Sequence, residues 1–219
     1  MKNSICFYSI FLFSVFIFPQ GIFAQKNITP MRFKLYAGAS LPEGDFSSIH
    51  GEKAGYANAG FCGLIEGSKL IGESVTWVSS VSLSSNKLDD GEMERQLNGI
   101  SVSAGNYITT WLMTGFGFET PASPTVKFYG HGQIGLLLSS FPDITLSYMG
   151  QSVTQTTSLG TSFAYGFGGG ILINNVNLGL RYYTGEPEYV ETAGNNGATS
   201  TFKAKLPATV LQLLIGINL

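Results

Sequence analysis

Residues that could do chemistry are few in this chain, because only 12% of its 219 residues are charged. Six charges stand inside otherwise apolar segments: Arg32, Lys34, Glu66, Glu119, Lys127 and Arg181. An isolated charge in apolar surroundings is very costly, so these side chains must pair with one another. Fixed pairs would hold a structure together, whereas pairs that exchange partners could gate a path for ions. We expect the fixed network and keep the gate as its alternative.

His131 is the residue whose type best suits acid–base catalysis. Tyr129 and Gln133 stand at alternate positions beside it, so an extended chain places all three on one polar face. A catalytic histidine needs a nucleophile and an orienting carboxylate within hydrogen-bond reach. The sequence indicates no such set for His131 or His50. We expect His131 to be a hydrogen-bonded interior residue, and we predict no catalytic residue and no enzyme activity.

Acidic residues gather in two segments that could bind a cation. The first contains Asp89-Asp90-Gly91-Glu92, but a calcium loop needs ligands at alternate positions, then glycine and a distant glutamate. The second, residues 186–200, contains three glutamates before the run Gly194-Asn195-Asn196-Gly197. We expect two solvated loops, the second with a flexible tip. Weak calcium binding is the alternative for the first, and no metal site is predicted.

Two further features resemble reactive or ligand-binding elements only in part. The run Gly166–Gly170 is not followed by a helical pattern, so it does not form a phosphate-binding loop. Its glycines instead indicate space in which side chains of other strands can pack. Cys62 has no basic neighbour that would favour a thiolate, which predicts a buried apolar role. Neither feature implies a cofactor, and none is predicted.

The amino terminus has the pattern of an export signal. Lys2 supplies a positive charge, the segment from Ile5 to Phe18 is nearly all apolar, and Ala24 offers a small residue for cleavage. The apolar run is shorter than the roughly twenty residues that a spanning helix needs. We predict a secretory signal peptide at 1–24 and one mature domain at 25–219, whose fold follows from the pattern below.

After this signal, apolar and polar residues alternate with a period of two, which indicates β-strands. The pattern predicts eight strands, at residues 32–41, 54–66, 73–85, 108–119, 125–139, 159–173, 176–185 and 207–218. A bilayer accepts only helices and closed barrels, and no further segment is long and apolar enough for a spanning helix. The expected fold is therefore all-β, an eight-stranded antiparallel up-and-down transmembrane β-barrel.

The connections between these strands alternate in length. Short links follow the second, fourth and sixth strands, and long polar links follow the other strands. Bacterial outer membrane barrels have short turns at the periplasmic rim and long loops outside. The third long link, residues 141–158, keeps alternating, which predicts a hairpin above the membrane that continues strands five and six, with its tip at Gly150.

The apolar face of each strand is predicted to meet lipid. The polar face carries the charges and many small residues, such as Ser80, Ser82 and Ser84, which suit the narrow interior of a small barrel. The six charges named above are then a lumen charge network. The apolar face carries aromatic residues near both ends of the strands. Membrane barrels have such aromatic residues at the two interfaces of the bilayer. These predicted membrane-interface aromatics are Phe33, Trp77, Phe116, Phe118, Phe128, Phe163, Tyr165 and Tyr182.

Three segments carry a resemblance to a known family. They are LYAGASLP at 35–42 followed by Gly44-Asp45-Phe46, YGFGGGI at 165–171 and NLGLRYY at 177–183. In these glycine–aromatic alternations the chain resembles the porin-family outer membrane barrels of Bacteroidetes-type bacteria. The resemblance covers essentially the whole mature chain and implies a fold similar to the transmembrane domains of OmpA and OmpX.

The predicted function is that of a non-enzymatic integral protein of the bacterial outer membrane, with a structural or surface-recognition role through four long extracellular loops. Expected partners are outer membrane lipids and the barrel assembly machinery, and a monomer is expected. The net charge of −2 predicts no nucleic-acid partner. The alternatives are a narrow porin-like channel for small solutes, a lipid-modifying barrel enzyme and a soluble secreted barrel that binds an apolar ligand.

Overall fold

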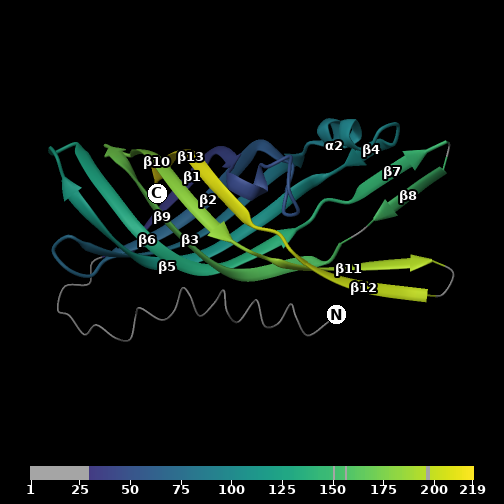
Figure 1. The fold of residues 1–219 in the computed structure, drawn as a ribbon. Coiled ribbons are helices and arrows are strands. Elements are labelled where there is room, and N and C mark those ends of the chain that lie inside the picture. Colours follow the sequence, from purple (N-terminus) through teal and green to yellow (C-terminus); the bar gives the residue numbers. More distant parts are fainter. Residues whose placement is uncertain (1–29, 150, 156, 196–197) are drawn as a thin grey trace.

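The computed structural model describes residues 30–149, 151–155, 157–195 and 198–219, and most of them form one closed β-barrel (Figure 1). The eight barrel strands are β1 (Arg32–Pro42), β2 (Ala57–Leu70), β3 (Val75–Leu88), β5 (Asn106–Pro121), β6 (Val126–Ser140), β9 (Leu159–Ile173), β10 (Val176–Gly185) and β13 (Ala208–Asn218). The predicted fold class is confirmed. The signal peptide predicted at 1–24 lies outside the described residues.

Every barrel strand is antiparallel to both of its neighbours. The order around the ring is β10, β13, β1, β2, β3, β5, β6 and β9, and β9 pairs with β10 to close it. The first and last strands meet through a ladder that runs from Lys34 opposite Asn218 to Pro42 opposite Val210. Closure leaves no open edge in the barrel wall, so the backbone ladders continue around the whole ring.

The short connections lie together at one rim, as predicted. The link between β9 and β10 is the two-residue turn Asn174-Asn175, in which Asn174 adopts a positive φ of 53°. Tight hairpins favour such left-handed residues, and asparagine tolerates them well. The chain ends at this same rim, where the N–H of Leu219 donates to the carbonyl of Phe33 (2.9 Å).

The acidic segment after β3 is solvated, as its sequence predicts, but it is not a simple loop. It contains helix α2 (Asp90–Gln96) and the short strand β4 (Ser101–Ala104). The side chain of Asp89 caps the helix by accepting a hydrogen bond from the N–H of Glu92 (3.0 Å). In the described part of the chain, no helix is long and apolar enough to cross a membrane.

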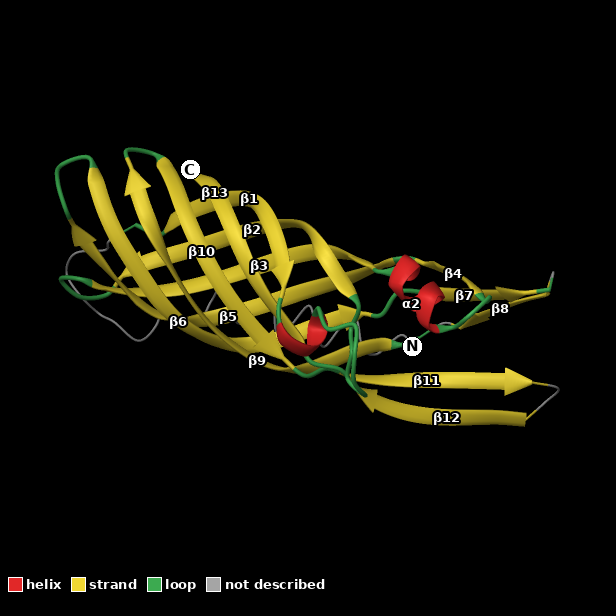
Figure 2. Ribbon diagram, turned by 45° about the horizontal axis from the view of Figure 1, so that its top comes forward, coloured by secondary structure: helices red, strands yellow, loops and turns green. Residues whose placement is uncertain are grey.

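The predicted hairpin in the third long connection is present. Strand β7 (Ile144–Tyr148) pairs with β8 (Gln151–Gln155), and the expected tip, Gly150, lies outside the described residues. Strand β7 also pairs with β4, so two connections build one three-stranded sheet beyond the barrel (Figure 2).

The fourth long connection is a second hairpin where the sequence predicts a solvated loop. Strand β11 (Glu188–Asn195) pairs with β12 (Ala198–Lys205), and β11 touches the barrel wall where Glu188 opposes Thr161 of β9. Gly194 and Asn195, from the predicted tip, pair in this ladder with Thr199 and Ala198. The other two residues of the expected tip, 196 and 197, lie outside the described residues.

The two faces of the barrel wall differ in polarity as the alternation predicts. On β10, Leu178 and Leu180 point outward and are exposed, whereas Arg181 points inward and is fully buried. On β13, Ile215 faces outward and Gln212 lies inside. Inside-out polarity of this kind places apolar area on the exterior, which stabilises a protein only where hydrocarbon covers it.

Candidate functional site in the barrel lumen

Large inward side chains fit inside the barrel because one wall strand carries glycine at three successive inward positions. On β9, the inward positions Gly166, Gly168 and Gly170 carry only hydrogen. A Cβ on Gly168 would overlap the side chain of Arg181, and Gly166 and Gly170 leave similar space for a tyrosine each. The glycine-rich run therefore provides packing space, as its sequence indicates.

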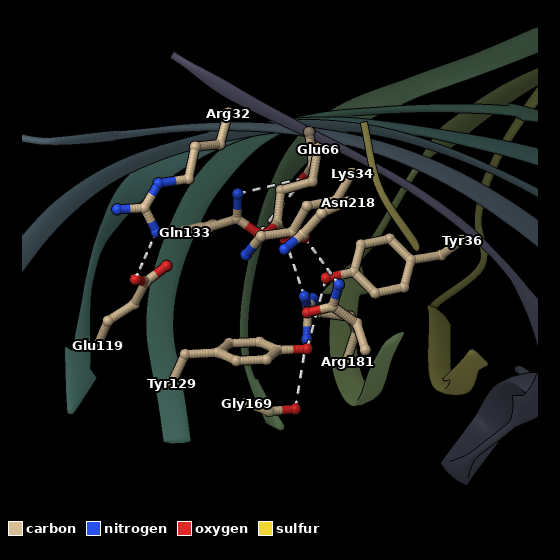
Figure 3. Close-up of polar contacts among 12 residues, drawn as sticks. Arg32, Lys34, Tyr36, Glu66, Glu119, Tyr129, Gln133, Gly169, Arg181 and Asn218 are labelled. Atoms are coloured by element: carbon tan, nitrogen blue, oxygen red, sulfur yellow. Dashed lines mark hydrogen bonds and ion pairs between the residues drawn. The ribbon is translucent and has the colours of Figure 1, made fainter. Parts of the chain in front are cut away.

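A carboxylate held by two cations lies at the centre of the lumen (Figure 3). Lys34 Nζ donates to Glu66 Oε1 (3.0 Å), and Arg181 Nη2 donates to Glu66 Oε2 (2.8 Å). The three residues are 3%, 1% and 0% exposed in the order Lys34, Glu66 and Arg181. Each carboxylate oxygen has its own charged partner, so the desolvated charge of Glu66 is fully matched. One positive charge is left over in this group.

Two tyrosine rings face the surplus positive charge. The Nζ of Lys34 lies 4.7 Å from the ring centroid of Tyr129, and the guanidinium carbon of Arg181 lies 5.4 Å from the same centroid and 5.5 Å from that of Tyr36. The electron-rich face of an aromatic ring attracts cations at these distances, most strongly where water is excluded. Arg181 Nη1 also donates to the carbonyl of Leu180 (3.0 Å).

The remaining predicted network residues lie at the short-turn rim. Arg32 Nη1 donates to Glu119 Oε2 (2.8 Å), and this pair is partly exposed (Figure 3). Lys127 lies on the inward-facing side of β6, with Tyr129 and His131. It makes no ion pair with the residues that the structure describes. The structure thus joins five of the six predicted charges in two separate groups and leaves Lys127 apart.

His131 lies inside the lumen, 7% exposed, with its ring stacked on that of Tyr129 (centroids 6.4 Å apart). The interior position is as predicted, but Nε2 has no hydrogen-bond partner among the described residues. No hydroxyl or carboxylate in the described chain bonds to His131 as a triad would require. The described part of the chain also holds no group of three potential metal ligands.

A second polar layer, next to the charges, was not recognised in the sequence. Gln212 Nε2 donates to Ser82 Oγ and Ser84 Oγ (2.9 Å each), and Gln133 Oε1 accepts a hydrogen bond from Tyr183 (3.3 Å). The alternating serines of β3 were a signal for it, because their hydroxyls need inward partners. Their glutamine partner lies 128 to 130 positions away in the chain, which no local pattern reveals.

Aromatic side chains cover the lumen at the long-loop end. Phe46, in the short helix η2 (Gly44–Phe46), meets Tyr107 edge to face, and Phe141 lies between Tyr107 and Tyr189. Tyr107 donates to the carbonyl of Gly55 (2.8 Å) and Tyr189 to Ser139 Oγ (2.7 Å). These four rings, which we call the aromatic cap, tie three long connections to the barrel.

The predicted interface aromatics stand on the outer wall. Phe116, Phe118, Phe163 and Tyr165 are exposed there, and Trp77 and Tyr182 are half-buried on the same face. Phe33 and Phe128 are exposed near the short-turn rim. The sequence prediction omitted Phe167, which also points outward and stacks on Tyr182 (centroids 5.1 Å apart).

No protein-family model matches this chain, and no curated protein matches it in sequence. Solved structures are similar in fold. A major outer membrane protein from Thermus thermophilus superposes with a TM-score of 0.51 at 14% identity, over 86% of this chain and 98% of that one. Neisserial surface protein A matches with a TM-score of 0.49 at 13% identity, over 89% and 99%.

The attachment invasion locus protein Ail of Yersinia pestis matches with a TM-score of 0.46 at 12% identity, over 88% of this chain and 100% of that one. At such identities the likeness extends to the fold and not to the residues of a site. The chain therefore shares its closed barrel fold with the Thermus thermophilus protein, whose TM-score is above 0.5.

Proposed function

We propose that this chain is a non-enzymatic integral protein of the bacterial outer membrane whose long connections act at the cell surface, as structural elements or in recognition. The observation that carries the proposal is the inverted polarity of the barrel. Phe61, on the outer wall, is 81% exposed, whereas Glu66 on the same strand is buried in the lumen. Water would penalise this arrangement and hydrocarbon favours it.

The extensions beyond the barrel support a role at the surface. The sheet of β4, β7 and β8 and the hairpin of β11 and β12 both project from the long-loop end (Figure 1). The aromatic cap fixes their bases to the rim. Loops on a rigid scaffold are the usual carriers of binding function. Export by the predicted signal at 1–24, insertion by the barrel assembly machinery and a monomeric state belong to the same proposal.

The proposal is tested by cell fractionation with heat-modifiable electrophoresis. We expect the protein in the outer membrane fraction, with a migration in detergent that changes on boiling because the closed ladder of the barrel resists unfolding. Protease added to whole cells should cleave the β7–β8 or β11–β12 hairpin. Recovery from the aqueous periplasmic fraction without detergent would instead favour the soluble barrel that binds an apolar ligand.

A narrow channel for small solutes is the second candidate. The paired charges around Glu66, the glutamine–serine layer and the aromatic cap follow one another along the lumen, which weighs against a continuous path. The gate hypothesis can be tested at Glu66, because an exchange of partners there would break at least one of its two ion pairs. Liposome swelling with sugars of graded size would identify such a channel.

A further inference from the structure

Two side chains with unpartnered nitrogens flank one glycine of the lumen wall. Gly168 of β9 lies opposite His131 of β6 on one side and opposite Arg181 of β10 on the other. Nε2 of His131 and Nε of Arg181 are buried, and neither has a hydrogen-bond partner among the described residues. Buried polar atoms normally have a partner, so both nitrogens point to a ligand that they share.

The absence of a side chain at Gly168 brings these two nitrogens together. A Cβ on Gly168 would overlap Cδ of Arg181, to which Nε is bonded, and would lie 2.8 Å from Nε2 of His131. Both side chains therefore lean over the same glycine. An acceptor about 3 Å from each nitrogen can serve two donors up to about 6 Å apart, so one atom can bond to both.

The ligand must accept hydrogen bonds, because the unused groups around it are donors. Arginine Nε always carries a proton, and a neutral imidazole can carry its proton on Nε2. Nζ of Lys34 has three protons, and in the described chain it makes one hydrogen bond, to Glu66. The hydroxyls of Tyr36 and Tyr129 share a single contact of 3.5 Å, in which only one of them can donate.

The net charge of the group favours an anion over a neutral acceptor. Lys34 and Arg181 carry two positive charges against the single negative charge of Glu66 (Figure 3). The faces of Tyr36 and Tyr129 attract these cations but have no net charge of their own. A buried charge without a counter-charge is costly, and one monovalent anion would make the group neutral.

We propose that Nε of Arg181 and Nε2 of His131 bind one small inorganic anion, chloride, inside the lumen. Chloride accepts hydrogen bonds from several directions and supplies the missing negative charge. A water molecule would satisfy the two nitrogens but would leave the positive charge uncompensated. The site lies in the barrel interior and goes beyond the proposed function, because it does not depend on what the long connections recognise.

Crystals of the protein grown with bromide in place of chloride test the position directly. Bromide has a similar size and the same charge, and its anomalous scattering locates it. We expect one strong anomalous peak in hydrogen-bond contact with both Nε of Arg181 and Nε2 of His131. Peaks confined to the long connections, with none at these two nitrogens, would overturn the proposal.

Urea titration in detergent micelles tests the site in solution. Chloride is exchanged for gluconate at constant ionic strength, because gluconate is too large to replace chloride between the two side chains. For one ion that binds only the folded state, each tenfold rise in chloride above its dissociation constant lowers the unfolding equilibrium constant about tenfold. We expect this dependence in the wild type.

Two lysine variants separate the site from general effects of salt. Lys34→Met removes the surplus charge and leaves the pair of Arg181 with Glu66, so the dependence on chloride should be lost. Lys127→Met is the matched control, because Lys127 also faces inward but makes no ion pair with the described residues. The control should keep the dependence of the wild type.

Each remaining outcome also decides. Equal chloride dependence in the wild type and Lys34→Met rejects the anion and assigns the bridging position to water. If Lys34→Met does not fold, the bromide map of the wild type decides alone, in favour with a peak at the two nitrogens and against without one. Neither result bears on the location of the protein, which cell fractionation tests separately.

Discussion

At the scale of single residues, Glu66 is the side chain on which the lumen depends most. It is the only partner of both Lys34 and Arg181 among the ion pairs of the described chain. A buried pair adds little net stability compared with well-packed apolar residues, but a buried charge that loses its partner is severely destabilising. The charge balance at this point therefore controls whether the barrel folds.

We expect Glu66→Gln to lower the free energy of unfolding by about 3–5 kcal/mol, because two cations would remain buried without a counter-charge. Urea titration of the barrel folded in vesicles measures the change. Glu119→Gln is the control, since its partner Arg32 is partly exposed at the rim and such a pair contributes about 1 kcal/mol or less. Equal losses in the two variants would contradict the importance of the central pair.

The inward glycines of β9 give a second prediction at this scale. Gly168→Ala should cost about 1–3 kcal/mol, because the new methyl group overlaps Arg181 and forces its side chain from the position that binds Glu66. The same urea titration applies, with Gly63→Ala as the control, because that glycine faces outward with space around it. A neutral Gly168→Ala would mean that the lumen has more free space than the packing of Arg181 indicates.

At the scale of elements, the hairpins beyond the barrel depend on a few contacts at their bases. Strand β11 is joined to the barrel by one ladder position, by two hydrogen bonds between Val190 and Ser158, and by Tyr189, which is buried in the aromatic cap. Burial raises the pKa of Tyr189 to about 12, while its hydrogen bond to Ser139 lowers the pKa by a smaller amount. The phenol is therefore neutral while the hairpin is docked.

The docked hairpin should loosen at high pH. Because the pKa of Tyr189 is higher when docked than its ordinary value of 10, the contribution of Tyr189 to docking is complete below pH 10 and is lost as the pH rises through about 12. Ultraviolet titration of tyrosine, as the difference between the wild type and Tyr189→Phe, measures this ionisation. A difference curve centred at 10 would show that Tyr189 is not buried in solution.

At the scale of the whole molecule, the lumen is a stack of layers and the exterior is apolar. The layers are the charged group, the glutamine–serine contacts and the aromatic cap. An eight-stranded barrel is narrow enough for such side chains to fill its interior. This architecture favours a rigid support for the extensions over a pore.

We accordingly expect no steady conductance when the protein is inserted in planar bilayers at any moderate voltage. Glu66→Gln, if it folds, tests the gate, because it weakens the central ion pairs without changing the size of the side chain. Discrete openings in the wild type would contradict a fixed network, and openings confined to Glu66→Gln would show that these pairs close a path.

The sequence by itself determined the barrel strands and the two faces of the wall. Predicted strands at 159–173 and 176–185 agree at both ends with β9 and β10, because the side-chain period of two is a local property of an extended chain. The position of the short turns followed equally from local chemistry, as in Asn174-Asn175.

Only the tertiary structure decided which residues meet across the lumen and what the long connections become. Arg181 finds Glu66 at a separation of 115 positions, Lys127 stays apart, and Nε2 of His131 lacks the expected partner. Such pairings are set by the stagger between strands when the sheet closes, and no local pattern encodes that stagger. The hairpin β11–β12 likewise forms where a polar sequence suggested a loop, and its base meets the barrel where Glu188 opposes Thr161 of β9.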